Sequence, residues 1–441
     1  MQSIEQLLGQ IADWVWGPPL LILLVGTHLF LTFRLKFIQR YLGQAIKLSF
    51  QRKEEGFGDI SHFGALTTAL AATIGTGNIV GVATAVAAGG PGAVLWMWLT
   101  GVFGIATKYG EALLAVKYRV QNKQGQFCGG PMYAIERGMK LKWLAILFAA
   151  FTAISAFGIG NMVQANSIST MVQQTFNVPP WISGLIMTAF TALVILGGIK
   201  SIARVCEGLV PFMAIFYVIG CLVLLIWKFD TLGETISLII SSAFTGHAVV
   251  GGFAGATVMA ALRYGVARGL FSNESGLGSA PIVAAAAQTT NPVRQALVSS
   301  TGTFWDTVVV CAMTGLVVVN SGLWTQGLNG AALTQAAFGE FHTLGPIILS
   351  IALLTFVFST ILGWSYYGEK AAEYLFGLGV IKYYRMMWVI AVMIGSVVSL
   401  KSVWTFADIT NGLMAVPNLI SLLALSGIIV AETRAHLWEK K

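Results

Sequence analysis

Residues 71–81 read Ala-Ala-Thr-Ile-Gly-Thr-Gly-Asn-Ile-Val-Gly and lie in the middle of the long apolar segment 61–88. Glycines, hydroxyl groups and an amide at such a place predict a membrane helix that unwinds near its centre. An unpaired backbone amide or carbonyl group is costly in hydrocarbon, so a break of this kind survives only where it lines a cavity or holds a polar ligand. We therefore expect the functional site at this break.

The composition indicates a polytopic membrane protein. Of the 441 residues, 56% are hydrophobic and only 10% are charged. A membrane-spanning helix needs about 20 apolar residues, so the chain has room for roughly ten to twelve spans and little mass outside the bilayer. We expect one all-α transmembrane domain over residues 1–441.

Eleven apolar segments are expected to cross the lipid bilayer. The first, 14–33, follows acidic residues instead of a basic region, which favours a retained helix over a cleaved signal. The other ten are 61–88, 92–116, 143–172, 181–198, 202–227, 248–288, 293–319, 345–368, 386–400 and 404–430.

Lysine and arginine fill alternate loops, above all 34–53 and 117–142, whereas loops 89–91 and 173–180 carry no charge. Since basic residues are enriched in cytoplasmic loops, this pattern predicts a cell-membrane protein with its N-terminus outside and its C-terminus in the cytoplasm. The same topology explains the net charge of +8. No nucleic-acid partner is expected.

The sequence contains no motif typical of an enzyme. The four cysteines have no paired spacing, and the five histidines are dispersed. The glycines of residues 71–81 match a loose dinucleotide pattern, but no strand precedes them. We expect transport driven by an ion gradient, and a channel is the rival class because broken half-helices also build pores.

A second break is predicted five segments later, where residues 271–281 read Phe-Ser-Asn-Glu-Ser-Gly-Leu-Gly-Ser-Ala-Pro. Corresponding breaks in two halves of a transporter indicate an inverted repeat with the binding site at the repeat interface. We therefore expect one repeat over residues 61–227 and another over residues 248–430, with the two breaks meeting at the bilayer midplane.

The ends of the broken helices suggest the ligand. Amide groups near Gly77 and Asn78 begin a half-helix, whose positive end suits a carboxylate. Carbonyl groups near Phe271 and Ser272 end a half-helix, whose negative end suits an ammonium group or a cation. Together they predict a site for a small zwitterion, and an amino acid is the simplest candidate.

Five motifs spread over nearly the full chain resemble the alanine/glycine:cation symporter family. They are Thr73-Ile-Gly-Thr-Gly-Asn78, Gly89-Gly-Pro-Gly-Ala-Val-Leu-Trp-Met-Trp98, Gly129-Gly-Pro-Met-Tyr133, Phe271-Ser-Asn-Glu-Ser-Gly-Leu-Gly278 and Gly363-Trp-Ser-Tyr-Tyr-Gly-Glu-Lys370. One departure is Leu95, where phenylalanine is usual. The resemblance implies sodium-coupled uptake of alanine or glycine on the five-plus-five inverted-repeat fold shared with neurotransmitter:sodium symporters, with one extra N-terminal helix. Proton coupling remains the alternative.

By analogy with those symporters, four residues are candidates for holding Na⁺. These are the carbonyl groups of Ala71 and Ile74 and the hydroxyl groups of Ser359 and Thr360. The alternative is that both hydroxyl groups bond only to their own helix, as membrane hydroxyls often do.

The substrate-binding candidates are centred on the two breaks. Thr76, Gly77 and Asn273 lie in the quoted motifs, and Asn78 is assigned either to the substrate or to a second cation site. Gln164 is a neutral partner for a zwitterion, and its neighbour Asn161, three residues earlier on the same helical face, is the weaker candidate. Interhelical hydrogen bonding is the alternative for both amides.

Two aromatic side chains are candidates for the pocket wall. Phe271 adjoins the second break, and Trp364 lies one turn beyond Thr360. Such a wall would admit a methyl group and reject larger side chains. Packing in the core is the alternative for both.

Carboxyl groups inside apolar segments also need a reason, because an unpaired charge there is expensive. The residues are Glu111, Glu207, Glu274 and Asp306. Glu274 lies inside the second break, where it would neutralise an ammonium group, organise the break or carry a proton. Arg263 and Arg268 precede the same break, either paired with such acids or lining the outer vestibule.

Overall fold

The protein is described here from a computed structural model that covers residues 4–51, 56–245, 257–341, 344–398 and 401–439. Nearly all of these residues are helical, and the strands among them form one short antiparallel hairpin in which Val120 pairs with Cys128. The prediction of an all-helical protein is confirmed. The predicted segment 248–288 begins in residues that lie outside the described part.

The elements follow one another along the chain with short connections. The first half contains α1 (Ile4–Val15), α2 (Pro18–Arg34), α3 (Leu42–Ser49), α4 (His62–Thr73), α5 (Val82–Gly89), α6 (Gly92–Lys117), β1 (Val120–Gln121), β2 (Phe127–Cys128), α7 (Pro131–Ala134), α8 (Lys142–Phe157), α9 (Val163–Phe176), α10 (Pro180–Ile195), α11 (Gly198–Trp227) and α12 (Leu232–Thr245). The second half contains α13 (Val258–Asn273), α14 (Pro281–Ala284), α15 (Pro292–Thr303), α16 (Ala312–Asn320), α17 (Gly330–Phe341), α18 (Gly345–Phe376), α19 (Ile381–Val397), α20 (Lys401–Ala424) and α21 (Ser426–Thr433).

Shorter turns join or continue these helices. The π-helical turns are η2 (Gly77–Gly81), η3 (Ile135–Met139), η4 (Gly158–Met162), η6 (Phe304–Cys311) and η9 (Arg434–Trp438). The 3-10 turns are η1 (Ile38–Tyr41), η5 (Phe229–Thr231), η7 (Leu323–Gln326) and η8 (Leu378–Val380).

Seven helices in the described residues are long and apolar enough to cross a membrane, and an eighth is counted when the bent pair formed by α4 and the helix Gly77–Gly89 is taken as one span. The seven are Glu5–Arg34, Lys142–Phe176, Gly198–Trp227, Pro292–Asn320, Gly345–Phe376, Leu378–Val397 and Thr405–Ala424. The three further predicted spans fall on α6, α10 and the interrupted α13, so the total of eleven stays a prediction. The chain is a multi-pass membrane protein.

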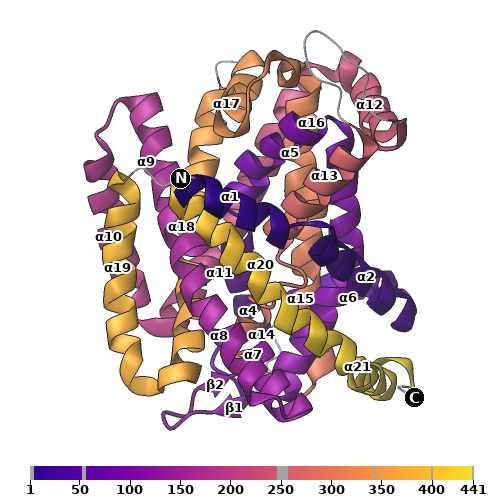
Figure 1. Ribbon diagram of the computed structural model, residues 1–441, viewed down its shortest axis with the longest axis vertical. Coiled ribbons are helices and arrows are strands. Elements are labelled where there is room, and N and C mark those ends of the chain that lie inside the picture. Colours follow the sequence, from indigo (N-terminus) through magenta and orange to yellow (C-terminus); the bar gives the residue numbers. More distant parts are fainter. Residues whose placement is uncertain (1–3, 52–55, 246–256, 342–343, 399–400, 440–441) are drawn as a thin grey trace.

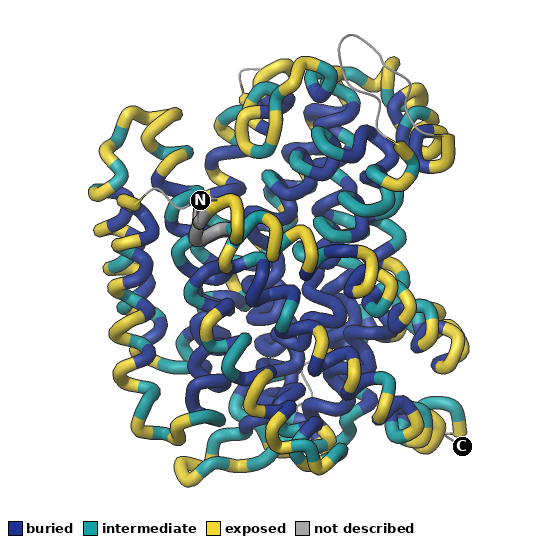
Figure 2. The backbone as a smooth tube through the Cα atoms, viewed as in Figure 1, coloured by how far each residue is buried: buried dark blue, intermediate teal, exposed yellow. Residues whose placement is uncertain are grey.

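Outward-facing apolar side chains support this conclusion. On α10, Leu185, Ile186, Phe190 and Leu193 are each more than half exposed. Exposed apolar surface of this extent marks contact with a membrane or a partner protein. Buried residues instead gather in the middle of the molecule, while α10 and α19 form one outer edge (Figure 2).

Figure 1 shows how the elements are divided between the two ends of the molecule. Helices α12, α16 and α17 lie at one end, whereas α7 and the β1–β2 hairpin lie at the other, which we call the hairpin end. Helices α4 and α14 lie towards the hairpin end, and α5 and α13 lie towards the opposite end. Each broken segment therefore contributes one half to each end.

Side-chain caps fix where the broken segments start. The hydroxyl group of Ser61 accepts a hydrogen bond from the amide of Gly64 at the start of α4. In the same way, the hydroxyl group of Thr257 accepts from the amide of Ala260 at the start of α13. These caps satisfy amide groups that have no partner within the helix.

Candidate functional site

The first break is confirmed, with a bend of 54° between α4 and the helix that follows it. Helix α4 ends at Thr73, and the chain resumes as the π turn η2 at Gly77. The side chain of Asn78 stabilises the break from within, because its amide oxygen accepts a hydrogen bond of 2.9 Å from the backbone amide of Gly75. A Cβ atom at Gly75 would lie only 2.6 Å from the hydroxyl oxygen of Thr360, so this position requires glycine.

The four predicted sodium ligands lie together at this break. The hydroxyl group of Ser359 donates to the carbonyl oxygen of Ala71 at 3.2 Å, and that of Thr360 donates to the carbonyl oxygen of Ile74 at 3.2 Å. Each hydroxyl group also bonds to the carbonyl oxygen of Phe356 in its own helix. The contacts to the first break and the contacts within the helix therefore coexist. The oxygen atoms that converge here are the kind of ligand that a hard cation prefers.

The second break follows Asn273, the last residue of α13. Glu274 adopts a left-handed conformation with φ of 56°, and Gly276 and Gly278 follow with φ of 90° and 85°. The regular helical hydrogen bonds therefore stop here, and α14 begins at Pro281. The predicted interruption is confirmed.

The loop of the second break is held by Glu111 of α6. One carboxylate oxygen of Glu111 accepts the backbone amides of Gly276 at 2.9 Å and Gly278 at 3.1 Å. The side-chain amide of Asn418 donates to the same oxygen at 2.7 Å. This buried carboxylate thus replaces the backbone partners that the interrupted helix lacks.

The two breaks touch each other. A Cβ atom at Gly77 would lie 3.1 Å from the ring of Phe271 and 3.5 Å from the Cα atom of Ser272. The sequence prediction that the breaks meet is therefore confirmed.

Asp306 joins the two breaks through one carboxylate. Its Oδ1 atom accepts a hydrogen bond of 2.7 Å from the side-chain amide of Asn78, and its Oδ2 atom accepts one of 2.8 Å from the hydroxyl group of Ser272. The hydroxyl group of Thr307 donates to Oδ2 at 2.7 Å. All four side chains are buried, so the carboxylate lies among polar groups in the core of the molecule.

The two predicted amides have different surroundings. The Nε2 atom of Gln164 donates to the hydroxyl oxygen of Thr76 at 3.2 Å, and its Oε1 atom accepts from the backbone amide of Thr76 at 3.4 Å. Asn161 donates instead to the carbonyl oxygen of Trp388 on α19 at 2.9 Å. Gln164 thus bonds to the first break, whereas Asn161, in the π turn η4, bonds to α19.

Trp364 is buried and fixed in position. Its indole nitrogen donates to a carboxylate oxygen of Glu274 at 3.0 Å, and the hydroxyl group of Ser279 donates to the other oxygen. Gly160 packs directly against Trp364, and a Cβ atom there would overlap the tryptophan side chain. Both oxygens of Glu274 therefore have partners within the protein.

Lys108 is a buried cation that the sequence analysis did not identify. Its ammonium nitrogen donates to the carbonyl oxygen of Asn273 at 2.8 Å, and only 3% of the residue is exposed. It also interacts electrostatically with Glu111, Glu274 and Asp306. A lysine within an apolar segment is itself a signal of function or pairing, and this signal was available in segment 92–116.

The remaining charged candidates are Glu207, Arg263 and Arg268. A carboxylate oxygen of Glu207 accepts the hydroxyl group of Ser61 at 2.9 Å. Arg263 forms an ion pair of 3.0 Å with Asp13 of α1, and the guanidinium group of Arg268 lies 5.7 Å from the ring centre of Phe271. The ion pair joins the end of α1 to α13.

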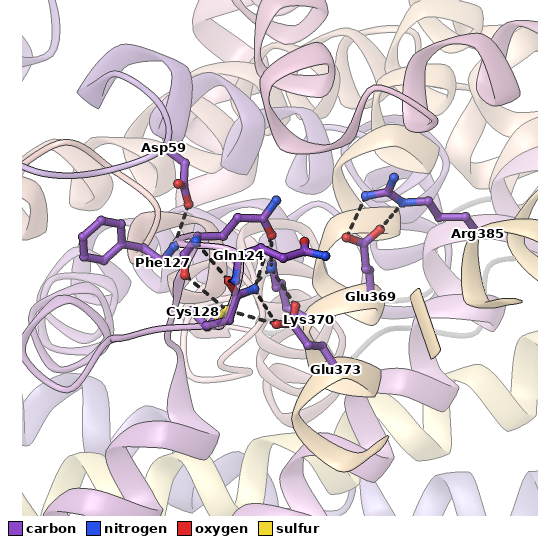
Figure 3. A network of polar contacts seen from close by, with 10 residues as sticks. Asp59, Gln124, Phe127, Cys128, Glu369, Lys370, Glu373 and Arg385 are labelled. Atoms are coloured by element: carbon purple, nitrogen blue, oxygen red, sulfur yellow. Dashed lines mark hydrogen bonds and ion pairs between the residues drawn. The ribbon is translucent and has the colours of Figure 1, made fainter. Parts of the chain in front are cut away.

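A separate polar network lies at the hairpin end (Figure 3). The ammonium group of Lys370 lies 2.7 Å from a carboxylate oxygen of Glu373 and 3.5 Å from the sulfur atom of Cys128. Asp59 accepts the backbone amide of Phe127 at 2.8 Å. Burial raises the pKa of the Asp59 carboxyl group above its usual value and raises the pKa of the Cys128 thiol to about 12.

Backbone hydrogen bonds also join the two broken segments at the hairpin end. Ile60 and Ala287 form a parallel bridge, with the amide of Gln288 donating to the carbonyl oxygen of Ile60 at 2.8 Å. The guanidinium group of Arg119 donates to four further carbonyl oxygens at 2.6–2.9 Å, which belong to Phe57, Ala285, Ala287 and Thr289. We call this set of contacts the inner closure.

Comparisons with known proteins place the chain among transporters. A family model described as "Sodium:alanine symporter family" matches residues 1–441. The chain is 52% identical to the sodium/alanine symporter AgcS of Methanococcus maripaludis, over 97% of this chain and 96% of that protein. It is 36% identical to the probable sodium/glutamine symporter GlnT of Bacillus subtilis, over 100% of this chain and 92% of that protein.

The fold is also similar to that of a solved structure. A crystal structure of a manganese transporter from Eremococcus coleocola superposes with a TM-score of 0.54 and 16% sequence identity, covering 83% of this chain and 78% of that one. At this identity the likeness concerns the fold alone.

Proposed function

Because the chain belongs to the sodium:alanine symporter family, we propose that it couples sodium influx to the uptake of a small neutral amino acid, alanine or glycine, by alternating access. The family assignment supports a cation-coupled amino-acid symporter. The observation that carries the finer proposal is the meeting of the two breaks at Asp306, which receives hydrogen bonds from Asn78 and Ser272. A movement of either broken segment therefore acts on the other.

The amino acid is proposed to bind where the breaks touch. Its carboxylate lies at the amide groups that begin η2, near Gly77 and Asn78, with Thr76 and Gln164 beside it. A half-helix start of this kind binds a carboxylate without a basic side chain. We therefore place the substrate carboxylate at the start of this half-helix.

The other end of the zwitterion is proposed to face α13. Lys108 already bonds to the carbonyl oxygen of Asn273, so we assign the substrate ammonium to the carbonyl groups of Phe271 and Ser272. Asn273 is proposed to contact the substrate through its side-chain Nδ2 atom, which has no hydrogen-bond partner among the described residues. Phe271 and Trp364 form the wall that limits side-chain size.

Sodium is proposed to bind at Ala71, Ile74, Ser359 and Thr360. The bound ion would order the first break and so strengthen amino-acid binding at the adjacent half-helix. Thermodynamic linkage requires that the amino acid strengthens sodium binding by the same factor. Equal alanine affinity with and without sodium would contradict this coupling.

The proposal includes an inverted repeat of residues 61–227 and 248–430, preceded by the extra helix at residues 14–33. It also includes a plasma-membrane location with the N-terminus outside and the hairpin end in the cytoplasm. The basic loops support this orientation, because Arg119, Lys370 and Arg385 all lie at the hairpin end.

The test is uptake by the full-length protein in proteoliposomes. Labelled L-alanine is expected to accumulate against its gradient when sodium is high outside, and a proton gradient alone is expected to be ineffective. The variant Asp306→Asn should reduce uptake at least tenfold, because each hydrogen bond to a buried charged group is worth about 1.5–3 kcal/mol. The exposed Asp230→Asn serves as the matched control.

Three results would contradict parts of the proposal. Accumulation driven by protons alone would favour the proton-coupled alternative. Conductance without saturable, concentrative uptake would favour a channel. Unchanged uptake by Asp306→Asn would show that transport does not depend on the connection between the two breaks through Asp306.

A further inference from the structure

A polar pocket lies beside the second break. It has a volume of about 120 Å³, lies between α1, α13 and α20, and is lined by Asp13, Trp16, Arg263, Arg268, Phe271 and Asp408 among others. We call it the Arg268 pocket. Phe271 belongs both to this pocket and to the contact with Gly77. Its ring therefore separates the pocket from the meeting point of the breaks.

The charges of the Arg268 pocket are balanced but not fully paired. Arg263 and Asp13 neutralise each other through a 3.0 Å ion pair, and both are well exposed. Arg268 and Asp408 are half-buried. Within the described residues, the guanidinium group of Arg268 contacts the ring of Phe271 and interacts electrostatically with Asp408, but no hydrogen bond is formed by the guanidinium group or by the Asp408 carboxylate.

The position of Asp408 is fixed through its backbone. The indole nitrogen of Trp16 donates to the carbonyl oxygen of Asp408 at 2.9 Å and so ties α20 to the end of α1. This bond leaves the carboxylate of Asp408 available to a ligand. One cation and one anion, each with hydrogen-bonding capacity to spare, thus line the same small space.

We propose that the Arg268 pocket is a second, peripheral binding site for a small zwitterionic amino acid. The substrate carboxylate pairs with Arg268, its ammonium group pairs with Asp408, and its side chain lies against Trp16 and Phe271. A guanidinium group is well suited to a carboxylate because it donates two parallel hydrogen bonds. A ligand with only a positive or only a negative group would leave either Arg268 or Asp408 without an oppositely charged partner.

The size of the pocket fits this ligand. On this measure a cavity of about 10–15 Å³ holds one water molecule, so the pocket has room for a small ligand of several non-hydrogen atoms. This volume is sufficient for glycine or alanine. The inference rests on the proposed function, because it assumes that the transported amino acid is the ligand of both sites.

The experiment measures how many molecules of labelled L-alanine bind per chain of the purified full-length protein at saturating sodium. The wild type is expected to bind two. The variants Arg268→Gln and Asp408→Asn should each bind one, whereas Arg268→Lys, which keeps the charge, should bind two. Arg204→Gln removes an exposed guanidinium group from α11 and should also bind two.

A sodium-site variant separates the two sites. In Thr360→Val the central site is weakened, and the alanine that remains bound at low sodium should disappear when Arg268→Gln is added. The filling variant Ala267→Trp tests the same site by volume and should bind one alanine even if removal of a charge affects folding.

The outcomes distinguish this inference from the proposed function. One alanine per wild-type chain, together with normal sodium-driven uptake, overturns the peripheral site and leaves the proposed function intact. Two alanines in Arg268→Gln also overturn it, and so does complete loss of binding in a folded Arg268→Gln, because Arg268 would then act at the central site. Absence of sodium-driven uptake by the wild type is a failure of the proposed function.

Discussion

The ammonium nitrogen of Lys108 lies 2.8 Å from the backbone carbonyl oxygen of Asn273, so a side chain of the protein itself occupies the carboxyl end of the half-helix α13. Three buried carboxyl groups, those of Glu111, Glu274 and Asp306, interact with this single cation. Lys108 therefore offsets negative charge at the second break before any ion or substrate binds there.

Replacement of Lys108 should destabilise the protein. We expect Lys108→Met to lower the free energy of unfolding by roughly 3–5 kcal/mol, because removal of one partner leaves buried charges without compensation. Thermal unfolding of the purified protein measures the change. Lys123→Met, at the exposed tip of the hairpin, is the control. Equal melting temperatures for the two variants would show that Lys108 has no such role.

Sodium binding should depend on the Thr360 hydroxyl group. We expect Thr360→Val to raise the sodium concentration for half-maximal uptake about tenfold, which corresponds to about 1.4 kcal/mol. The maximal rate at saturating sodium should change less. Thr355→Val is the control, since Thr355 lies on the same helix and its hydroxyl group bonds to carbonyl groups of that helix. A shift of the same size in both variants would refute a ligand role.

Substrate size should be set by Trp364. We expect Trp364→Ala to let leucine and methionine compete with alanine uptake, because the large side chain at the breaks is removed. Trp388→Ala removes an equally buried tryptophan on α19 and serves as the control for loss of packing. If leucine fails to compete in a Trp364→Ala protein that still transports alanine, Trp364 is not part of the wall.

The rate at which Cys128 is alkylated should depend on whether the inner closure is intact. With a pKa of about 12, the thiol is almost entirely neutral at about pH 8, and the thiolate is the reactive form. Alkylation should therefore be slow in the wild type and faster in Arg119→Ala, which loses the hydrogen bonds to four carbonyl oxygens. Residue-resolved mass spectrometry measures the rate, and Lys123→Ala is the control. Identical alkylation rates in the wild type and in both variants would show that Arg119 does not stabilise the inner closure.

The sequence was sufficient to locate both breaks because glycine and hydroxyl residues are costly inside an apolar helix unless the backbone is needed there. A Cβ atom at Gly75 would collide with the Thr360 side chain, and one at Gly77 would make a tight contact with the ring of Phe271. The pairing of Ser359 and Thr360 with the first break came only from the family resemblance, since a hydroxyl group that bonds to its own helix has the same sequence pattern.

Other features of the site depend on tertiary contacts and leave little trace in the sequence. Asp306 was recognised as an intramembrane acid, but its position between Asn78 and Ser272 depends on the π turn η6, which hydrophobic periodicity does not detect. The bond of Asn161 to the carbonyl oxygen of Trp388 joins residues 227 positions apart, and no local pattern indicates it. Lys108 was overlooked because, among charges inside apolar segments, only the acids and the two arginines before the second break were considered.

The bridge between Ile60 and Ala287 is made by main-chain atoms. Amino-acid replacements other than proline leave the donors and acceptors of such a bridge in place. Substitutions around the proposed binding site would therefore leave the hydrogen bonds of this bridge in place. Relatives with different substrates are therefore expected to differ in the residues of the site while they keep this main-chain connection.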